Sequence, residues 1–219
     1  MYLPGRQGIP MTADSISDIL ELRAHLRRQI LTERDSLSPE FRSAASLAIT
    51  DRLWPLEPFA EANTLFTYVN FRSEPETGTI IHRALAAGKV VTVPYTVIGS
   101  HLLACRIKDP ALELRPGYCS IPEPDPATSP PVAPRSIDVV LLPGSVFDLQ
   151  GGRLGYGGGY YDRFLAREAP QALRIGLAFE KQVVDKLPLE LHDIPLHLLV
   201  TEERLLDFRK TSCQKEHHK

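Results

Sequence analysis

The chain has 219 residues, of which 43% are hydrophobic and 24% are charged, and its formal net charge is −2. These values predict one soluble globular domain with a substantial core. They exclude a strong positive field of the kind that draws nucleic acid or anionic lipid, and no apolar run approaches the roughly 20 residues of a membrane span. Three scattered cysteines and an N-terminus without an apolar signal core predict free thiols and a cytoplasmic location.

In chain order, residues 1–14 are expected to form a loose arm. A helix is expected to follow, because apolar residues recur at spacings of three and four: Ile19, Leu22, Leu26 and Ile30. Arg23 and Arg27 lie four positions apart and therefore share one face of this helix. On their own they are consistent with a solvated surface, and an anion-binding face is the alternative.

Helices and strands then alternate along the chain. Further helices are predicted at 38–53, 77–87 and 160–167, and strands at 64–69, 89–94, 101–107, 137–143, 174–179 and 198–201. The proline-rich stretch 116–134 is interpreted as a surface loop, and residues 209–219 as a polar tail. The alternation predicts a single α/β domain over 15–208 with a largely parallel sheet, in which ligands bind outside the carboxyl ends of the strands.

Six glycines fall within residues 151–159, between an apolar run and the predicted helix 160–167. So many glycines carry a large entropic cost, which a string of bare backbone N–H groups facing an anion at a helix N-terminus would explain. Arg153 and Arg163 flank the loop as candidate phosphate ligands, and Asp162 is a natural Mg²⁺ ligand beside phosphate. The stretch is interpreted as a cradle for a nucleoside triphosphate. A flexible linker is the alternative, which the aromatic residues directly after it disfavour.

Other chemistries are less well supported. Ser145 lacks the Gly-x-Ser-x-Gly context of a hydrolase nucleophile, and the histidines show no metal-ligand spacing. Glu74 and Glu76 follow a predicted strand on the ligand side of the sheet, where they either contact a ligand or are solvated loop residues. Asp193 lies in a turn and is, by sequence alone, a local hydrogen-bonding residue, with metal binding as the alternative.

The glycine stretch reads Arg153-Leu-Gly-Tyr-Gly-Gly-Gly-Tyr-Tyr-Asp-Arg-Phe-Leu165 and is preceded by Leu142-Pro-Gly-Ser-Val-Phe-Asp148. Together these segments resemble the signature of 5-formyltetrahydrofolate cyclo-ligases, also called methenyltetrahydrofolate synthetases. Further matches occur in the family's order along the chain: Arg23-x-x-Leu26-Arg27 with Ser38, Glu74-Pro-Glu76-Thr77, Ile121-Pro-Glu-Pro124, and His192-Asp-Ile-Pro195 with Val200-Thr201.

This resemblance implies a fold and a reaction. The fold is a three-layer α/β/α sandwich of the NagB/RpiA/CoA-transferase type with a mostly parallel sheet. The reaction is the ATP- and Mg²⁺-dependent cyclisation of 5-formyltetrahydrofolate to 5,10-methenyltetrahydrofolate, with release of ADP and phosphate. No side-chain nucleophile is expected, because the formyl oxygen of the substrate itself attacks the γ-phosphorus.

The resemblance also implies roles for individual residues. The expected ATP-binding residues are Arg23, Arg27, Arg153, Leu154, Gly155, Tyr156, Gly157, Gly158, Gly159, Tyr160 and Tyr161. The expected substrate-binding residues are Arg27, Val69, Glu74, Tyr156, Gly157, Gly158, Gly159 and Tyr160. The residues expected to hold Mg²⁺ are Asp162 and Asp193.

Three positions depart from the family pattern. Arg23 stands where many members have Lys, which keeps the charge but changes the shape. Tyr156 and Gly158 stand where some members have basic residues, so the backbone N–H groups and Arg153 are expected to hold the phosphates. Two alternatives remain: a non-catalytic regulatory member that binds folate or nucleotide, and a sugar-phosphate isomerase or CoA-transferase-like enzyme with phosphate in the loop. The expected partner is 5-formyltetrahydrofolate, with or without a polyglutamate tail, for a monomer that binds neither nucleic acid nor membrane.

Overall fold

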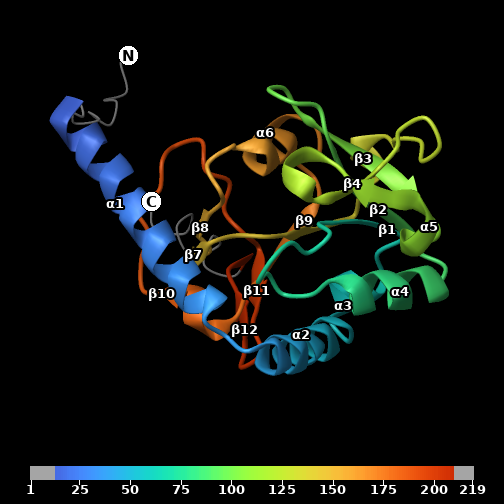
Figure 1. Ribbon diagram of the computed structural model, residues 1–219, viewed down its shortest axis with the longest axis horizontal. Coiled ribbons are helices and arrows are strands. Elements are labelled where there is room, and N and C mark those ends of the chain that lie inside the picture. Colours follow the sequence, from blue (N-terminus) through green and yellow to red (C-terminus); the bar gives the residue numbers. More distant parts are fainter. Residues whose placement is uncertain (1–12, 210–219) are drawn as a thin grey trace, which may run out of the picture.

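The computed structural model describes residues 13–209 (Figure 1). The predicted arm lies outside the described residues, except for its last two positions, which belong to the first helix. The predicted tail lies outside them too, except for Arg209, whose guanidinium pairs with Asp207 at 2.6 Å. Within the described range, no helix has both the length and the apolar character needed to span a membrane.

A seven-stranded sheet forms the centre of the molecule. From one edge to the other its strands are β12 (Leu205–Asp207), β11 (Leu198–Val200), β9 (Leu173–Leu177), β6 (Val139–Leu142), β1 (Thr64–Thr67), β2 (Val90–Thr96) and β3 (Leu102–Ile107). The five central strands run parallel, and the strand at each edge is antiparallel to its neighbour. The predicted α/β fold with a mostly parallel sheet is confirmed.

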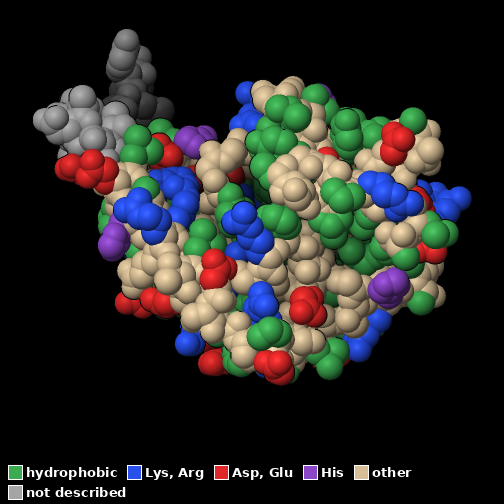
Figure 2. All heavy atoms as spheres, in the orientation of Figure 1, with side chains coloured by type: hydrophobic (Ala, Val, Ile, Leu, Met, Phe, Trp, Pro, Cys, Tyr) green, Lys and Arg blue, Asp and Glu red, His purple; other side chains and the backbone are tan. Residues whose placement is uncertain are grey.

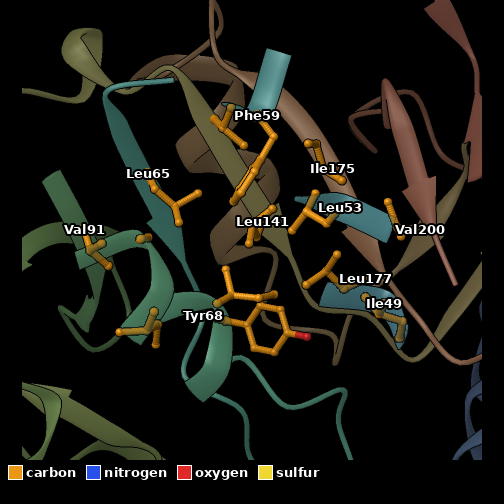
Figure 3. Packing of buried hydrophobic residues seen from close by; sticks show 14 of the residues in the cluster. Ile49, Leu53, Phe59, Leu65, Tyr68, Val91, Leu141, Ile175, Leu177 and Val200 are labelled. Carbon is orange, nitrogen blue, oxygen red and sulfur yellow. The ribbon is translucent and has the colours of Figure 1, made fainter. Parts of the chain in front are cut away.

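Side chains of alternate residues in the central strands point into two separate hydrophobic cores, as the two-residue period of a strand requires. Leu65 and Leu141 point into one buried cluster, and their neighbours Phe66 and Val140 point into the other. Helices α2 (Pro39–Leu53), α3 (Glu57–Ala60) and α4 (Gly78–Ala86) close the first cluster, and Figure 3 shows Ile49 and Phe59 reaching toward the sheet there.

The other face of the sheet is covered by α6 (Tyr160–Arg167) and by a second, three-stranded sheet. That sheet has the order β10 (Val183–Val184), β7 (Val146–Asp148) and β8 (Arg153–Leu154). The arrangement is therefore a layered sandwich in which the small sheet replaces part of one helical layer. The glycine stretch begins in this layer and leads into α6, which places it at one end of the central sheet (Figure 1).

Helix α1 (Ala13–Asp35) lies against the small sheet rather than against the central one. Ile30 packs with Val146, Leu154 and Leu187 in a small cluster of its own. The rest of the helix extends along the side of the molecule, and Figure 2 shows basic side chains gathered over it. Because this apolar cluster is small, the hydrogen bonds and ion pairs of α1 contribute much to its attachment to the domain.

The proline-rich stretch contains more order than the sequence predicted. After the short helix α5 (Pro110–Glu113), β4 (Leu114–Pro116) and β5 (Pro122–Pro124) form an antiparallel pair, and the Glu123 carboxylate between its prolines is buried. That carboxylate accepts hydrogen bonds from the backbone and the hydroxyl of Thr96. Proline is tolerated here because a two-stranded ribbon leaves its outer N–H positions unpaired.

Candidate active site

The six glycines of the central stretch divide into two groups. Gly151 and Gly152 form the turn between β7 and β8, where Asp148 accepts hydrogen bonds from the backbone of Gln150 at 2.9 Å and of Gly152 at 2.6 Å. A Cβ on Gly152 would lie 2.6 Å from an oxygen of Asp148, and Gly151 has φ +88°. These two glycines therefore shape the hairpin, and the candidate cradle is reduced to the four glycines after β8.

Those four glycines lie in an exposed loop, residues 155–159, that runs into α6. Gly157 has φ +100°, and an added Cβ there would meet nothing within 4 Å among the described residues. Gly159 occupies the N-cap of α6 in the left-handed region, with φ +62°. At Gly157 the bare backbone thus faces open space close to a helix N-terminus, which is an arrangement that favours an anion, whereas an added Cβ at Gly158 or Gly159 would contact Tyr160 or Arg163.

The aromatic and basic residues after the loop hold it in place. The hydroxyl of Tyr160 accepts a hydrogen bond from the backbone of Gly99 at 3.0 Å. The guanidinium of Arg163 lies 4.9 Å from the centre of the Tyr160 ring and donates to the carbonyl of Gly158 at 2.8 Å. Arg163 is a candidate phosphate ligand, and in the structure its guanidinium is hydrogen-bonded to the loop.

Two arginines of α1 turn inward toward this loop. Arg23 is only 5% exposed and grips both carboxylate oxygens of Asp193, at 2.7 and 3.1 Å. Its guanidinium also lies 3.0 Å from Glu190, and Arg27 donates to the carbonyl of Gly155 at 2.9 Å. The solvated-surface interpretation of these arginines is therefore wrong for the described fold, because both bind the rest of the protein.

A second ion pair lies beside the first. Arg153 donates to Asp162 at 2.9 Å, and the backbone of Ile194 donates to the same carboxylate oxygen at 3.2 Å. Since Ile194 directly follows Asp193, the two expected metal ligands lie on neighbouring segments. The Nε of Arg153 is buried and has no hydrogen-bond partner among the described residues, so this arginine has an unused donor inside the site.

The donor set of this region suits Mg²⁺ beside phosphate. Asp162 and Asp193 offer carboxylate oxygens, which are hard ligands, next to the glycine loop. No group of three His, Cys, Asp or Glu side chains comes together among residues 13–209. A Mg²⁺ ion held here would take its other ligands from phosphate and water, as Mg²⁺ commonly does.

The positive charge of Arg23 keeps the Asp193 carboxylate ionised. Burial raises the pKa of Asp193, but the hydrogen bonds and positive charge of Arg23 outweigh burial, and the pKa lies below its usual value. Burial lowers the pKa of the Arg27 guanidinium, and neighbouring Arg23 lowers it further. The Asp193 carboxylate is therefore ionised at neutral pH, with both of its oxygens held by Arg23.

Two of the expected substrate residues, Glu74 and Tyr156, meet at the glycine loop. Tyr156 reaches out of the glycine loop and its hydroxyl donates to Glu74 at 2.5 Å. The second oxygen of Glu74 accepts from the backbone of Phe71 at 2.9 Å. Val69 is half-buried at the start of the same segment, whereas Glu76 is exposed, with its backbone fixed to α2 by Ser46. Of the two candidate glutamates, only Glu74 lies in the site.

Burial affects the Glu74 carboxyl and also the Tyr156 hydroxyl, although the Tyr156 residue as a whole is 52% exposed. Burial raises the pKa of Glu74, and the hydrogen bonds from Tyr156 and Phe71 and the charge of Arg34 offset only part of that rise. Burial and the nearby Glu74 raise the pKa of Tyr156 above its ordinary value, so its hydroxyl stays protonated and remains a donor.

The side chains of two expected ATP-binding residues pack against hydrophobic clusters of the protein. The Leu154 side chain is buried in the cluster that anchors α1. The Tyr161 side chain packs in the core, with its ring centre 6.1 Å from that of Phe66.

The sequence reasoning missed Arg34, which is 2% exposed and donates to the Tyr156 hydroxyl at 2.8 Å. Its signal was its spacing, because it lies seven residues, or two helical turns, after Arg27.

Comparison with known proteins identifies the family. The family model of the 5-formyltetrahydrofolate cyclo-ligase family matches residues 20–202. The 5-formyltetrahydrofolate cyclo-ligase of Escherichia coli (strain K12) is 31% identical over 182 residues, which cover 82% of this chain and 100% of that protein. A probable 5-formyltetrahydrofolate cyclo-ligase of Caenorhabditis elegans is 29% identical over 209 residues, covering 88% and 98% of the two chains.

Structural similarity agrees with the sequence comparison. The NMR structure of Aquifex aeolicus 5,10-methenyltetrahydrofolate synthetase superposes with a TM-score of 0.76 and 33% sequence identity, covering 86% of this chain and 93% of that one. The predicted family and enzyme class are confirmed. By sequence and by fold, the chain belongs to the 5-formyltetrahydrofolate cyclo-ligase family.

Proposed function

We propose that this chain catalyses the ATP- and Mg²⁺-dependent cyclisation of 5-formyltetrahydrofolate to 5,10-methenyltetrahydrofolate, with release of ADP and phosphate. The observation that carries the proposal is the meeting of three segments at one loop. Arg27 of α1 donates to Gly155 of this loop, Arg23 one turn earlier holds Asp193, and the Tyr156 hydroxyl of the loop donates to the carboxylate of Glu74. Basic side chains and a buried carboxylate thus come together at the same glycine loop.

The nucleotide side is proposed to consist of the glycine loop and its arginines. The N–H groups of residues 155–159 and the N-terminus of α6 offer donors and a favourable dipole to phosphate oxygens. Arg153 has a buried donor without a partner among the described residues, and Arg23 and Arg27 lie at the loop's border. Because these groups are already held in place, they would stabilise the charge on the phosphoryl group during its transfer.

Asp162 and Asp193 would hold Mg²⁺, which supplies neutralising charge to the phosphates. In the structure these carboxylates pair with Arg153 and Arg23. Nucleotide binding would therefore exchange partners among the four side chains, the arginines turning to phosphate oxygens. Each charged group has a partner before and after this exchange, so no charge is left buried and unpaired.

The chemistry needs positioning rather than a side-chain nucleophile. The formyl oxygen attacks the γ-phosphorus and ADP leaves. N10 then attacks the activated formyl carbon, the C–O bond to the new phosphate breaks, and N10 loses its proton. The products are the methenyl ring, ADP and phosphate, which balances the reaction. The protein's part is to hold the two substrates in line within a restricted site, which can supply a large share of the rate.

The test is formation of methenyltetrahydrofolate from 5-formyltetrahydrofolate, followed by absorbance. Product is expected only when protein, ATP and Mg²⁺ are all present, in proportion to the amount of protein. Saturable binding of ATP and folate without product would contradict catalysis and favour the non-catalytic regulatory member. Absence of ATP binding would contradict the assignment of the glycine loop. We further propose a cytoplasmic monomer; size-exclusion chromatography at micromolar concentration tests the oligomeric state.

A further inference from the structure

Arg34 is a buried cation without a carboxylate in direct contact. Its side chain is 2% exposed and donates to the hydroxyls of Ser73 at 3.0 Å and Tyr156 at 2.8 Å, and to the carbonyl of Gly144 at 3.4 Å. No acidic group within residues 13–209 lies within ion-pair distance of it. Burying a guanidinium in this way is costly, which calls for a reason beyond attaching α1.

The hydroxyl of Tyr156 connects Arg34 to Glu74. A guanidinium can only donate hydrogen bonds, so the tyrosine oxygen must accept from Arg34 and use its own proton toward Glu74. The other Glu74 oxygen already accepts from the backbone of Phe71. Both oxygens of Glu74 are therefore held as acceptors, which is the pattern of an ionised carboxylate.

Among residues 13–209, Arg34 is the single cation that acts on Glu74. The groups that face Glu74 are the side chain of Arg34 from α1, Tyr156 from the glycine loop, Tyr68 after β1, and Tyr161 of α6. The three tyrosines are neutral. The carboxylate of Asp35 bonds to Ser73 and thus reaches Arg34 through a second hydroxyl. Changing Arg34 therefore changes the balance of charge around Glu74 more than changing any other residue there.

We propose that Arg34 is a positioning residue for the folate side of the site: through the Tyr156 hydroxyl it holds Glu74 as an oriented, ionised carboxylate and keeps Tyr156 beside it. The inference rests on the proposed function in that Glu74 contacts the substrate. An ionised carboxylate with fixed orientation suits a nitrogen heterocycle that presents N–H donors. Arg23 and Arg27 border the nucleotide side, so one helix carries the positioning groups of both sides.

The test compares Arg34→Lys, Arg34→Met and Tyr156→Phe with Arg83→Met, an arginine of an exposed ion pair. Arg34→Met should raise the KM for 5-formyltetrahydrofolate by about 10-fold or more, the size expected when a hydrogen bond to a charged group is lost. The KM for ATP should stay within about 2-fold, since Arg34 contacts the loop through the Tyr156 hydroxyl and not through the backbone N–H groups proposed for the phosphates. Arg34→Lys should recover part of the loss, and Arg83→Met should match the wild type.

The pH profile separates positioning from a structural role. Removing the cation should raise the Glu74 pKa, so the acid limb of kcat/KM for the folate should move to higher pH in Arg34→Met and less in Arg34→Lys. Tyr156→Phe, which keeps the ring, should move it in the same direction. An equal fall in the use of both substrates with an unshifted profile would overturn the proposal. If Arg34→Met does not fold, the other two variants decide by the same criteria.

A second readout does not depend on turnover. NMR titration of the Glu74 carboxyl carbon in the wild type and the variants measures its pKa directly. A rise in Arg34→Met or Tyr156→Phe that Arg34→Lys largely avoids supports the inference, and an unchanged Glu74 titration overturns it. A wild-type protein that forms no methenyltetrahydrofolate contradicts the proposed function alone, and the titration still decides the role of Arg34.

Discussion

The two sides of the glycine loop pair their charges in different ways. On the side proposed for the nucleotide, Arg23 touches Asp193 directly at 2.7 Å, and the Asp193 pKa is lowered in spite of burial. On the side proposed for the folate, Arg34 reaches Glu74 through the hydroxyl of Tyr156, and burial raises the Glu74 pKa. A nearby arginine thus accompanies a lowered carboxyl pKa in one case and a raised pKa in the other. Direct contact with the guanidinium outweighs the loss of water around the carboxylate, whereas an arginine that acts through a hydroxyl offsets only part of that loss.

The difference matches the two proposed tasks. A carboxylate that shares Mg²⁺ must stay ionised over the whole neutral range, which a direct arginine partner ensures. A carboxylate that recognises a heterocycle benefits from a dry, oriented environment, and its charge is then sensitive to its neighbours. The following changes separate the two sides, beginning with the largest effect.

Asp162→Asn should damage the nucleotide side alone. We expect kcat/KM for Mg·ATP to fall by about 100-fold, comparable to the upper end found for residues that support metal ligands, while the KM for 5-formyltetrahydrofolate changes little. The measurement is initial rate at varied ATP and Mg²⁺. Asp51→Asn, in an exposed ion pair, is the matched control. An unchanged Mg²⁺ requirement would refute the role of Asp162.

Much of the fold was predictable because its signals are local. Ser38 precedes Pro39 and caps α2 by accepting from the backbone of Phe41, so the helix begins where the sequence indicated. The last strand, β12, was missed because three residues are defined as a strand only by their pairing with β11. The β4–β5 pair was missed because its short strands are also defined only by their pairing, and because its prolines locally favour a loop.

The site was predictable to the extent that its residues are adjacent in sequence. The glycine loop and Asp162 form one motif, and the structure keeps them together. Arg34 was not predictable, because its contacts come from Ser73 and Tyr156, which lie 39 and 122 residues away along the chain. Nor was the structural role of Gly151, which depends on close approach to Phe208 across the fold.

One alanine substitution in each group distinguishes the structural glycines from those of the proposed cradle. Gly152→Ala should lower the free energy of unfolding by about 2 kcal/mol, because the new Cβ collides with Asp148 in the β7–β8 turn. Gly157→Ala meets no neighbouring atom among the described residues, so its cost is the left-handed backbone, about 1 kcal/mol.

For ATP affinity we expect the reverse order, with the larger effect in Gly157→Ala and the smaller in Gly152→Ala. Gly157→Ala places a side chain in the open space of the loop and should lower the affinity for ATP beyond its effect on stability. Chemical unfolding and ATP titration of both proteins make the test. Normal ATP affinity in a folded Gly157→Ala protein would contradict a cradle in this loop.

The two sides should respond to pH with opposite signs. Between the usual glutamate pKa of about 4.3 and the raised pKa of Glu74, the folded protein binds more protons than the unfolded chain, so this group's contribution to stability falls as pH rises. Asp193 has a lowered pKa, so its contribution is complete above about pH 3.9 and is lost as the pH falls below that value.

The free energy of unfolding from pH 3 to 8 tests both signs. Relative to the wild type, Glu74→Gln should lose the component that declines with rising pH, and Asp193→Asn should lose the component that declines with falling pH. Parallel curves for the two variants would mean that the two carboxylates do not differ as the structure indicates.

The smallest effect should come from a direct pair outside the site. Arg83 and Asp51 are 2.7 Å apart, the same separation as Arg23 and Asp193, but their side chains are 41% and 58% exposed. Because water already solvates both charges, Arg83→Met should change the free energy of unfolding by roughly 0.5 kcal/mol or less. Denaturant titration at low and high salt provides the measurement. A loss of several kcal/mol would mean that contact distance, rather than burial, sets the strength of these pairs, and the contrast between the two sides of the loop would then need another cause.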